Sequence, residues 1–222
     1  MNSLFNIERD LHRKIIGCLG ILLPFILVFS AWAFNCIAVQ ESISAYYHTV
    51  VQHFFSWIVI IIGIFFLAYP VLDGYEADSK PFKIAGIFAL LVAFFPTNIE
   101  SFSDCTINSS TFGNYKITGW IHIISAASFF LILSYICIFL FTKSNKTIEE
   151  MSNDKKNSNR FYQLSGWAIL VCIILIAIYE FWAQNKFPSL KDLKPTFILE
   201  SIALLFFGLA YLIKGNLFLK NK

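Results

Sequence analysis

Long, nearly continuous runs of apolar residues alternate along the chain with short polar segments. A membrane-spanning helix needs about 20 mostly apolar residues, because the hydrocarbon core of a bilayer is about 30 Å thick. Six windows meet or approach this length: 15–39, 51–72, 82–98, 117–142, 162–184 and 195–214. The pattern predicts an all-α fold, an integral membrane bundle of six transmembrane helices that forms one domain over residues 1–222.

Two polar segments complete this organisation. Residues 1–14 resemble the start of a signal peptide, but the apolar run that follows is longer than the roughly 7–15 residues of the apolar region in a signal peptide. We therefore expect a retained first span. Residues 143–161 are charged and contain no Gly or Pro, which predicts a solvated cytoplasmic linker before the last two spans.

Composition supports a membrane location. Hydrophobic residues make up 57% of the 222 residues, charged residues only 14%, and the mean hydropathy is +0.67. Soluble domains carry about 25% charged residues, so this chain has too little polar surface to be one. The net charge of +3 does not indicate nucleic-acid binding, because the basic residues lie in loops and tails.

The distribution of Lys and Arg predicts the orientation. If the N-terminus is cytoplasmic, the segments on the outer side of the membrane hold four of the 17 basic residues: Lys116, Lys186, Lys191 and Lys194. The other 13 then lie on the cytoplasmic side, as the positive-inside rule requires. We therefore expect both termini in the cytoplasm. An abundance of Phe, Ile, Asn and Lys is typical of an AT-rich bacterial genome, which favours a bacterial inner (cytoplasmic) membrane.

Polar and ionisable side chains gather near the predicted outer ends of the spans. Because each costs a few kcal/mol in hydrocarbon unless paired, they should meet inside the bundle. Glu41, Ser44 and His48 have the spacing of one helical face. The sequence thus predicts a polar pocket, open to the outside, whose members are Glu41, Ser44, His48, Asp104, His122, Ser125, Glu180 and Glu200.

Several chemistries fit such a pocket. His48, His122 and Asp104 are candidate ligands for zinc, which takes His and carboxylate ligands and can acidify a water for hydrolysis. Without a metal, His48, His122 and Glu180 are the candidate catalytic residues of a His–carboxylate general base. A site that binds a lipid headgroup without chemistry is the third possibility. Ion or proton transport is disfavoured, because the mid-span positions are apolar.

Cysteines are distributed between spans and outer segments. Cys18, Cys137 and Cys172 fall inside predicted spans, where Cys behaves as a small apolar residue. Cys36 and Cys105 both fall near the outer face. In an oxidising compartment these two can form a disulfide, and two free thiols are the alternative.

Three short motifs carry a resemblance to known families. They are the segment from Glu41 to Thr49 (ESISAYYHT), Phe95-Pro96-Thr97 at the end of the third span, and the run from His122 to Phe130 (HIISAASFF). The chain resembles bacterial six-span proteins of the domain-of-unknown-function 998 family, and distantly the Frag1/DRAM family, in layout over nearly its whole length. This resemblance implies a six-span membrane fold and no established activity.

A second resemblance is to the hemolysin III, adiponectin-receptor and alkaline ceramidase superfamily, whose members bind zinc and hydrolyse amide bonds in lipids. The residues Ser44-Ala-Tyr-Tyr-His48 match its early Ser-x-x-x-His element. The last predicted span contains no His, and the chain has six predicted spans where that superfamily has seven.

These observations leave three functional hypotheses. The first is a protein that binds a lipid headgroup or a membrane partner through the pocket. The second is a lipid hydrolase, with zinc or with a His–carboxylate pair, that uses His48 and His122 with Glu41, Asp104 or Glu180. The third is a membrane effector or structural subunit that acts as a homo-oligomer.

Overall fold

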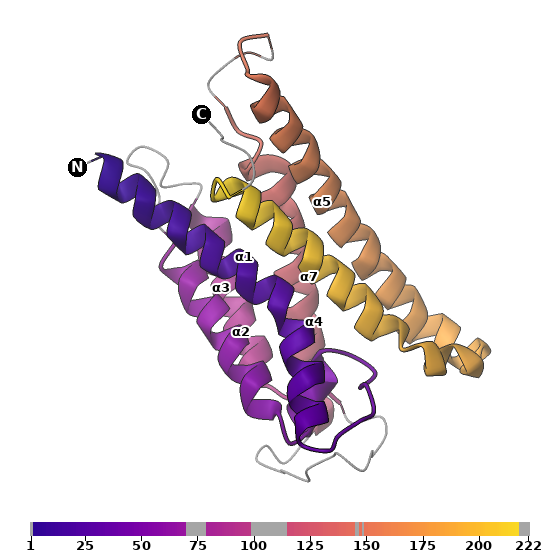
Figure 1. The fold of residues 1–222 in the computed structure, drawn as a ribbon. Helices are drawn as coiled ribbons and strands as arrows, with labels where there is room; N and C mark the ends of the chain where they lie inside the picture. Colours follow the sequence, from indigo (N-terminus) through magenta and orange to yellow (C-terminus); the bar gives the residue numbers. More distant parts are fainter. Residues whose placement is uncertain (1, 70–78, 99–114, 145–146, 148, 218–222) are drawn as a thin grey trace.

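The computed structural model of the chain describes residues 2–69, 79–98, 115–144, 147 and 149–217, which fold into a bundle of helices (Figure 1). In chain order the elements are α1 (Asn2–Ala33), the 3-10 helix η1 (Ser44–His48), α2 (Gln52–Leu67), α3 (Ser79–Phe94), α4 (Tyr115–Tyr135), the π-helical turn η3 (Ile136–Leu140), α5 (Asn153–Ile178), the π-helical turn η4 (Tyr179–Ala183), α6 (Gln184–Lys186), the 3-10 helix η5 (Pro188–Leu193) and α7 (Pro195–Lys214). No strand occurs among the described residues, so the predicted all-α class is confirmed for them.

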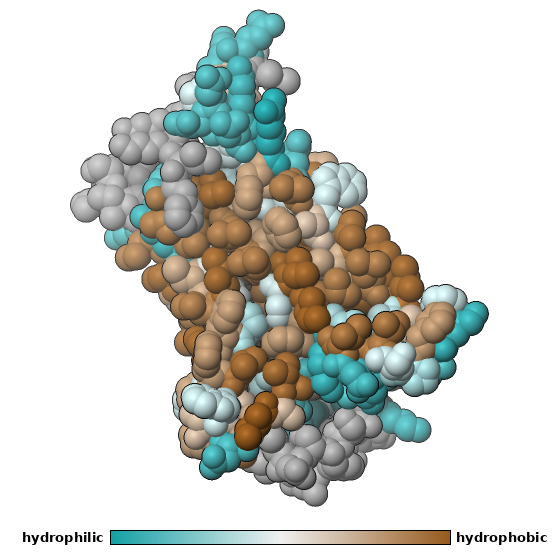
Figure 2. Space-filling view, turned by 45° about the vertical axis from the view of Figure 1, so that its right-hand side comes forward, coloured by the Kyte–Doolittle hydropathy of each residue, from teal (hydrophilic) through white to brown (hydrophobic). Residues whose placement is uncertain are grey.

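The described helices are those of a membrane protein. Four segments are long and apolar enough to cross a bilayer: Glu8–Ala33, Lys116–Leu140, Asn153–Lys186 and Pro195–Lys214. α2 and α3 have 16 residues each, or about 24 Å of helix. Hydrophobic side chains form a broad band across the middle of the molecule, with polar side chains at its two ends (Figure 2). Six spans with cytoplasmic termini therefore stay a prediction, whereas the fold shows a helical protein with four helices that are able to cross a membrane.

The helix boundaries differ from the predicted windows at several ends. α7 coincides with the window 195–214. α1 ends at Ala33, before the predicted residue 39, because Asn35 adopts a left-handed conformation (φ 61°). The N–H of Cys36 then bonds back to the Ala31 carbonyl at 2.9 Å, which is a common way to end a helix.

The predicted linker 143–161 is partly helical, which corrects the sequence interpretation. α5 begins at Asn153, and the Ser152 side chain accepts a hydrogen bond from the Lys155 N–H at 3.3 Å. Asp154 adds a negative charge in the first turn, where it complements the helix dipole. The N-cap signal was present in the sequence, but the high charge of the segment obscured it.

Glycines allow two helix pairs to approach closely. A Cβ added to Gly17 of α1 would lie 2.7 Å from the Gly208 carbonyl of α7, and one added to Gly208 would lie 2.6 Å from the Gly17 carbonyl. In α2 and α3, a Cβ on Gly86 would lie 2.8 Å from the Gly63 carbonyl. Such contacts between small residues are a main source of packing energy between helices in membranes.

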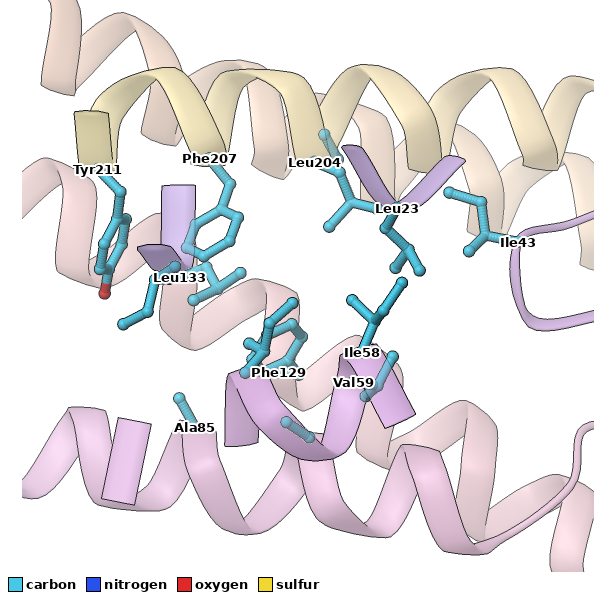
Figure 3. Close-up of a cluster of buried hydrophobic side chains, with 14 of the residues drawn as sticks. Leu23, Ile43, Ile58, Val59, Ala85, Phe129, Leu133, Leu204, Phe207 and Tyr211 are labelled. Carbon is cyan, nitrogen blue, oxygen red and sulfur yellow. The ribbon is translucent and has the colours of Figure 1, made fainter. Parts of the chain in front are cut away.

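A continuous apolar core joins α1, α2, α4 and α7. Leu23 of α1 points toward Ile58 of α2, and Phe129 and Leu133 of α4 lie beside Phe207 of α7 (Figure 3); all five are buried. Ile43, which precedes η1, is also buried and extends this core toward one end of the bundle. The core fixes α7 and the segment before η1 in position relative to α4.

At the end of the bundle where α7 terminates, cationic side chains pack onto polar atoms and aromatic rings. Arg13 donates from Nε to the Tyr69 hydroxyl at 2.7 Å. Lys214 donates from Nζ to the Phe141 carbonyl at 2.8 Å, and its Nζ lies 5.5 Å from the centre of the Tyr162 ring. We call this set of five residues the cationic end. Its charges are satisfied by direct contacts within the protein.

Candidate functional site

The opposite end of the bundle contains a cavity of about 400 Å³. Its walls come from the segment before η1, η1 itself, the segment after α3, α4, α5 with η4, η5, and the start of α7. This volume is within the range of pockets that hold small ligands, roughly 300–1,000 Å³. We call it the cavity below.

Most of the predicted site residues lie around this cavity. The lining includes Glu41, Ser44, His48, His122, Glu180 and Glu200. Ser125 is buried, with 2% of its surface exposed, but does not line the cavity. Asp104 lies outside the described residues. The structure thus brings together side chains from segments that are up to 159 residues apart in the sequence numbering, Glu41 and Glu200.

The predicted common helical face of Glu41, Ser44 and His48 is not formed. η1 begins only at Ser44 and is a 3-10 helix, so Glu41 precedes it in an irregular segment. The irregular backbone instead lets the Glu41 carbonyl accept a hydrogen bond from the Phe197 N–H at 3.0 Å. That N–H lies in the first turn of α7, where no partner within the helix exists.

The cavity lies where α4 and α5 separate. Beyond it, Ser134 of α4 donates to the Gly166 carbonyl of α5 at 2.8 Å, and a Cβ on Gly166 would lie 2.9 Å from the Ser134 carbonyl. From this contact α5 and α7 run away from α4 (Figure 1). The apolar wall between them includes Ile123 and Ala126 of α4 and Ala177 of α5.

The polar wall is built around the start of α7. Glu200 accepts a hydrogen bond from the Ile43 N–H at 2.6 Å, which ties the segment before η1 to α7. Glu41 forms ion pairs with Lys191 and Lys194, with Nζ–Oε1 distances of 3.3 and 3.6 Å. All three side chains of this ion-pair group are partly exposed, so its contribution to stability is small.

Lys194 adopts a left-handed backbone conformation, with φ 51°. A residue other than Gly in this region is uncommon, and the conformation costs about 1 kcal/mol or more. It immediately precedes Pro195, the first residue of α7, and turns the chain from η5 into that helix. The Lys194 side chain thereby reaches Glu41 across the cavity wall.

Glu180 and Glu200 form an acidic pair on this wall. Thr196 donates from its hydroxyl to Glu180 Oε1 at 2.5 Å. Glu180 lies in η4, a π-helical turn, and such turns often occur at functional sites because they reorient a side chain. Glu200 lines the same wall and accepts its hydrogen bond from the Ile43 N–H.

Two histidines face the cavity with defined tautomers. His48 Nε2 donates to the Thr97 carbonyl at 2.8 Å, and His122 Nδ1 donates to the Phe95 carbonyl at 2.7 Å. A carbonyl only accepts hydrogen bonds, so His122 Nε2 carries a lone pair in the neutral ring. This Nε2 is buried and has no hydrogen-bond partner among the described residues. His122 thus carries a buried acceptor without a partner among the described residues, on a side chain that lines the cavity.

Burial lowers the pKa of His48 from its ordinary value of 6.5, and the hydrogen bond to the Thr97 carbonyl opposes this effect only in part. His48 lies outside the helices that are long and apolar enough to cross a membrane. The ring is therefore neutral at pH 7, and its Nε2 remains a donor to Thr97.

The predicted zinc site is not formed by the part of the chain described here. Among the described residues, no group of three or more His, Cys, Asp or Glu side chains is placed to hold a metal ion. Zinc needs at least three protein ligands in catalytic sites. His48 and His122 each use one ring nitrogen on a carbonyl, which leaves the other ring nitrogen of each. The third candidate ligand, Asp104, lies outside the described residues, so the zinc site stays a prediction.

The cysteines have separate roles in the fold. Cys36 is disulfide-bonded, whereas Cys18, Cys137 and Cys172 are free thiols. The predicted partner of Cys36, Cys105, lies outside the described residues.

Sequence reasoning missed three polar residues that matter to the cavity. Lys191 and Lys194 were used only to predict the orientation of the chain in the membrane. Glu41, which is acidic and lies on the same predicted side, was available as their partner. Thr196 precedes Glu200 by four residues and therefore shares its helical face, a signal that was available. The π-helical turn that presents Glu180 has no evident sequence signal.

Comparisons of the chain with models of known families, with curated proteins and with solved structures gave no match.

Proposed function

We propose that this chain is a six-span protein of a bacterial inner membrane, with both termini in the cytoplasm, and that its cavity binds a membrane lipid through the headgroup. The observation that carries the proposal is the division of the cavity into an apolar wall and a polar wall. Ala126 and Ala177 lie on the first, and Glu180, Glu200 and His122 lie on the second. A lipid has the same division between acyl chain and headgroup.

The proposal of six spans draws on α2 and α3. Both helices pack alongside the longer ones, and both expose large apolar side chains, such as Trp57 (61% exposed) and Ile87 (51% exposed). Exposed residues of this kind are compatible with lipid and unfavourable in water. The asymmetry of Lys and Arg supports cytoplasmic termini.

A variant that fills the apolar wall tests lipid binding. Ala126→Phe places an aromatic ring in the cavity, and we expect it to reduce the lipid that remains with the purified protein. Val171→Phe is the matched control, because Val171 of α5 is 51% exposed and does not line the cavity. Lipid is quantified by mass spectrometry of extracts from protein in a mild detergent. Equal lipid content in both variants and in the wild type would contradict the proposal.

Labelling with a membrane-impermeant maleimide in intact cells tests the orientation. We expect Asp192→Cys to react and Ser152→Cys to react only after the cells are opened. Both positions are exposed, and they lie at opposite ends of the bundle. The wild-type protein reports the background from its own thiols. The reverse pattern would place the cavity on the cytoplasmic side.

A further inference from the structure

The apolar wall of the cavity is made by one face of α4 and one face of α5. On α4, the lining residues Ile123, Ala126 and Phe130 have the spacing i, i+3 and i+7, which places them on one side of the helix. On α5, Ile173 and Ala177 are four residues apart and share a face in the same way. Faces with small residues normally pack against a neighbouring helix in a membrane bundle, whereas here the cavity separates them.

The space between these two faces, which we call the α4–α5 gap, reaches the outer surface of the bundle. Ala177 is exposed and also lines the cavity, and its side chain is a single methyl group, so nearly the same atoms do both. Ile123 (39% exposed) and Phe181 (68% exposed) line the cavity as well. All three lie in segments that are able to cross a membrane, so in a bilayer this opening faces hydrocarbon.

The gap has a closed end and a polar end. Ser134 of α4 donates to the Gly166 carbonyl of α5 at 2.8 Å, and this contact closes the gap at one end. At the other end His122, which is 2% exposed, lines the cavity with an Nε2 that has no hydrogen-bond partner among the described residues. The twelve residues from His122 to Ser134 correspond to about 18 Å of helix, slightly more than half of the 30 Å hydrocarbon core.

We propose that the cavity opens sideways into the membrane through the α4–α5 gap, and that a lipid enters by this route and leaves one acyl chain lying along the gap. This inference rests on the proposed function, since it names the route and the part of the lipid that the apolar wall takes. A lipid is the occupant that fits both ends, because its chain covers the two apolar faces while its headgroup reaches His122. A water-soluble molecule would leave the apolar faces bare, and a helix from a second copy would bring no headgroup to His122.

A reversible cross-link across the gap tests the route. Ile123→Cys combined with Ala177→Cys, in a Cys18→Ser background, places one thiol on each lining face, and bis-methanethiosulfonate reagents of increasing length join the two thiols. The full-length protein in detergent is then mixed with chain-deuterated phosphatidylethanolamine and phosphatidylglycerol, and native mass spectrometry follows their uptake. We expect the cross-link to slow uptake by about tenfold or more, because it closes the path, and we expect reduction to restore the rate.

The two single-cysteine variants in the same background are the matched controls. Each carries the same reagent on one side of the gap without bridging it, and each undergoes the same reduction. Recovery of uptake on reduction shows that the cross-linked protein had stayed folded. Uptake at an unchanged rate in protein that is cross-linked across the gap would overturn the inference.

A photoactivatable lipid tests where the chain lies. Phosphatidylglycerol with a diazirine in one acyl chain is bound to the wild-type protein, and the sites of attachment are mapped by peptide mass spectrometry. We expect attachment at Phe130 and Ile173, and we expect Ala126→Phe to remove it. Ile87 of α3 is the internal control, because it is 51% exposed and does not line the cavity, so its labelling should not change. Equal labelling of Phe130 and Ile173 in both proteins would contradict the proposed position.

The outcomes separate this inference from the proposed function. If the cross-link leaves uptake unchanged but Ala126→Phe reduces the bound lipid, the cavity binds lipid that arrives by another path, and only the inference is wrong. If Ala126→Phe leaves the bound lipid unchanged, lipid does not occupy the cavity, and both proposals are overturned. Slow uptake that reduction reverses, together with loss of bound lipid in Ala126→Phe, supports both.

Discussion

The two ends of the bundle both carry charged residues, but they satisfy them in different ways. At the cationic end, Arg13 and Lys214 contact a hydroxyl, a carbonyl and aromatic rings of neighbouring helices directly. At the other end, Glu180, Glu200 and His122 surround a cavity of about 400 Å³. The comparison indicates that charged side chains stabilise the fold where they pack against other protein groups. Where they line a cavity, they form a candidate site. The following predictions test this distinction, beginning with the largest expected effect.

Arg13→Leu should destabilise the protein most. The substitution leaves the Tyr69 hydroxyl and the Lys214 carbonyl without their donor, and hydrogen bonds to charged groups contribute about 1.5–3 kcal/mol each. We expect a loss of about 3 kcal/mol in the free energy of unfolding, measured by thermal denaturation in detergent. Lipid retained per folded molecule should not change. Arg160→Leu, at an exposed position of α5, is the control and should have little effect.

Glu200→Gln should show the opposite behaviour. The amide oxygen can still accept from the Ile43 N–H, but a neutral hydrogen bond is about half as strong as a charged one. We expect a loss of about 1 kcal/mol or less in the free energy of unfolding, together with a clear fall in the affinity for the lipid that the cavity binds. A large loss of stability with unchanged affinity would remove the distinction between the two ends.

Thr196→Val should weaken ligand binding by a smaller factor. Valine has nearly the shape of threonine but cannot donate to Glu180, and one hydrogen bond contributes about 1 kcal/mol, or roughly fivefold in affinity. The Ser201 hydroxyl bonds to the Phe197 carbonyl of its own helix, so Ser201→Ala is a control on α7. Comparable losses in the two variants would mean that the Thr196–Glu180 contact does not position the carboxylate.

His48 predicts a weak dependence of stability on pH. Because burial lowers its pKa in the folded state, its contribution to stability is fully present above the ordinary pKa of 6.5 and is lost as the pH falls through the lowered value. The melting temperature of the wild type should therefore fall more steeply below about pH 6.5 than that of His48→Gln. His53→Gln is the control, because His53 is exposed and stacks on Trp57. Parallel curves for wild type and His48→Gln would show that His48 is not the titrating group.

Apolar periodicity and length predicted the helical class and several helix positions well. The window 195–214 coincides with α7, because Pro195 and the basic Lys214 mark its ends in the sequence. The rule that charge avoids hydrocarbon also placed residues as distant as Glu41 and Glu200 around one cavity. Both predictions depend on whether each residue is apolar or charged, which can be read directly from the sequence.

Features that depend on specific backbone geometry could not be predicted in the same way. The end of α1 depends on the left-handed conformation of Asn35, and the position of Glu180 depends on a π-helical turn. Ser125 shows the same limit: it was predicted as a member of the pocket, yet it is buried away from the cavity. Small rotations of a helix, which the sequence does not state, decide which side chains reach a site.

The hydrogen bond from the Ile43 N–H to Glu200 joins residues 157 positions apart. During synthesis the segment before η1 emerges long before α7 does, and domains generally fold from the N-terminal side first. The polar wall therefore cannot assemble until the ribosome has delivered the last helix. A product truncated before Pro195 would lack Thr196 and Glu200 and could not complete that wall, so ligand occupancy would mark only molecules in which α7 had been made.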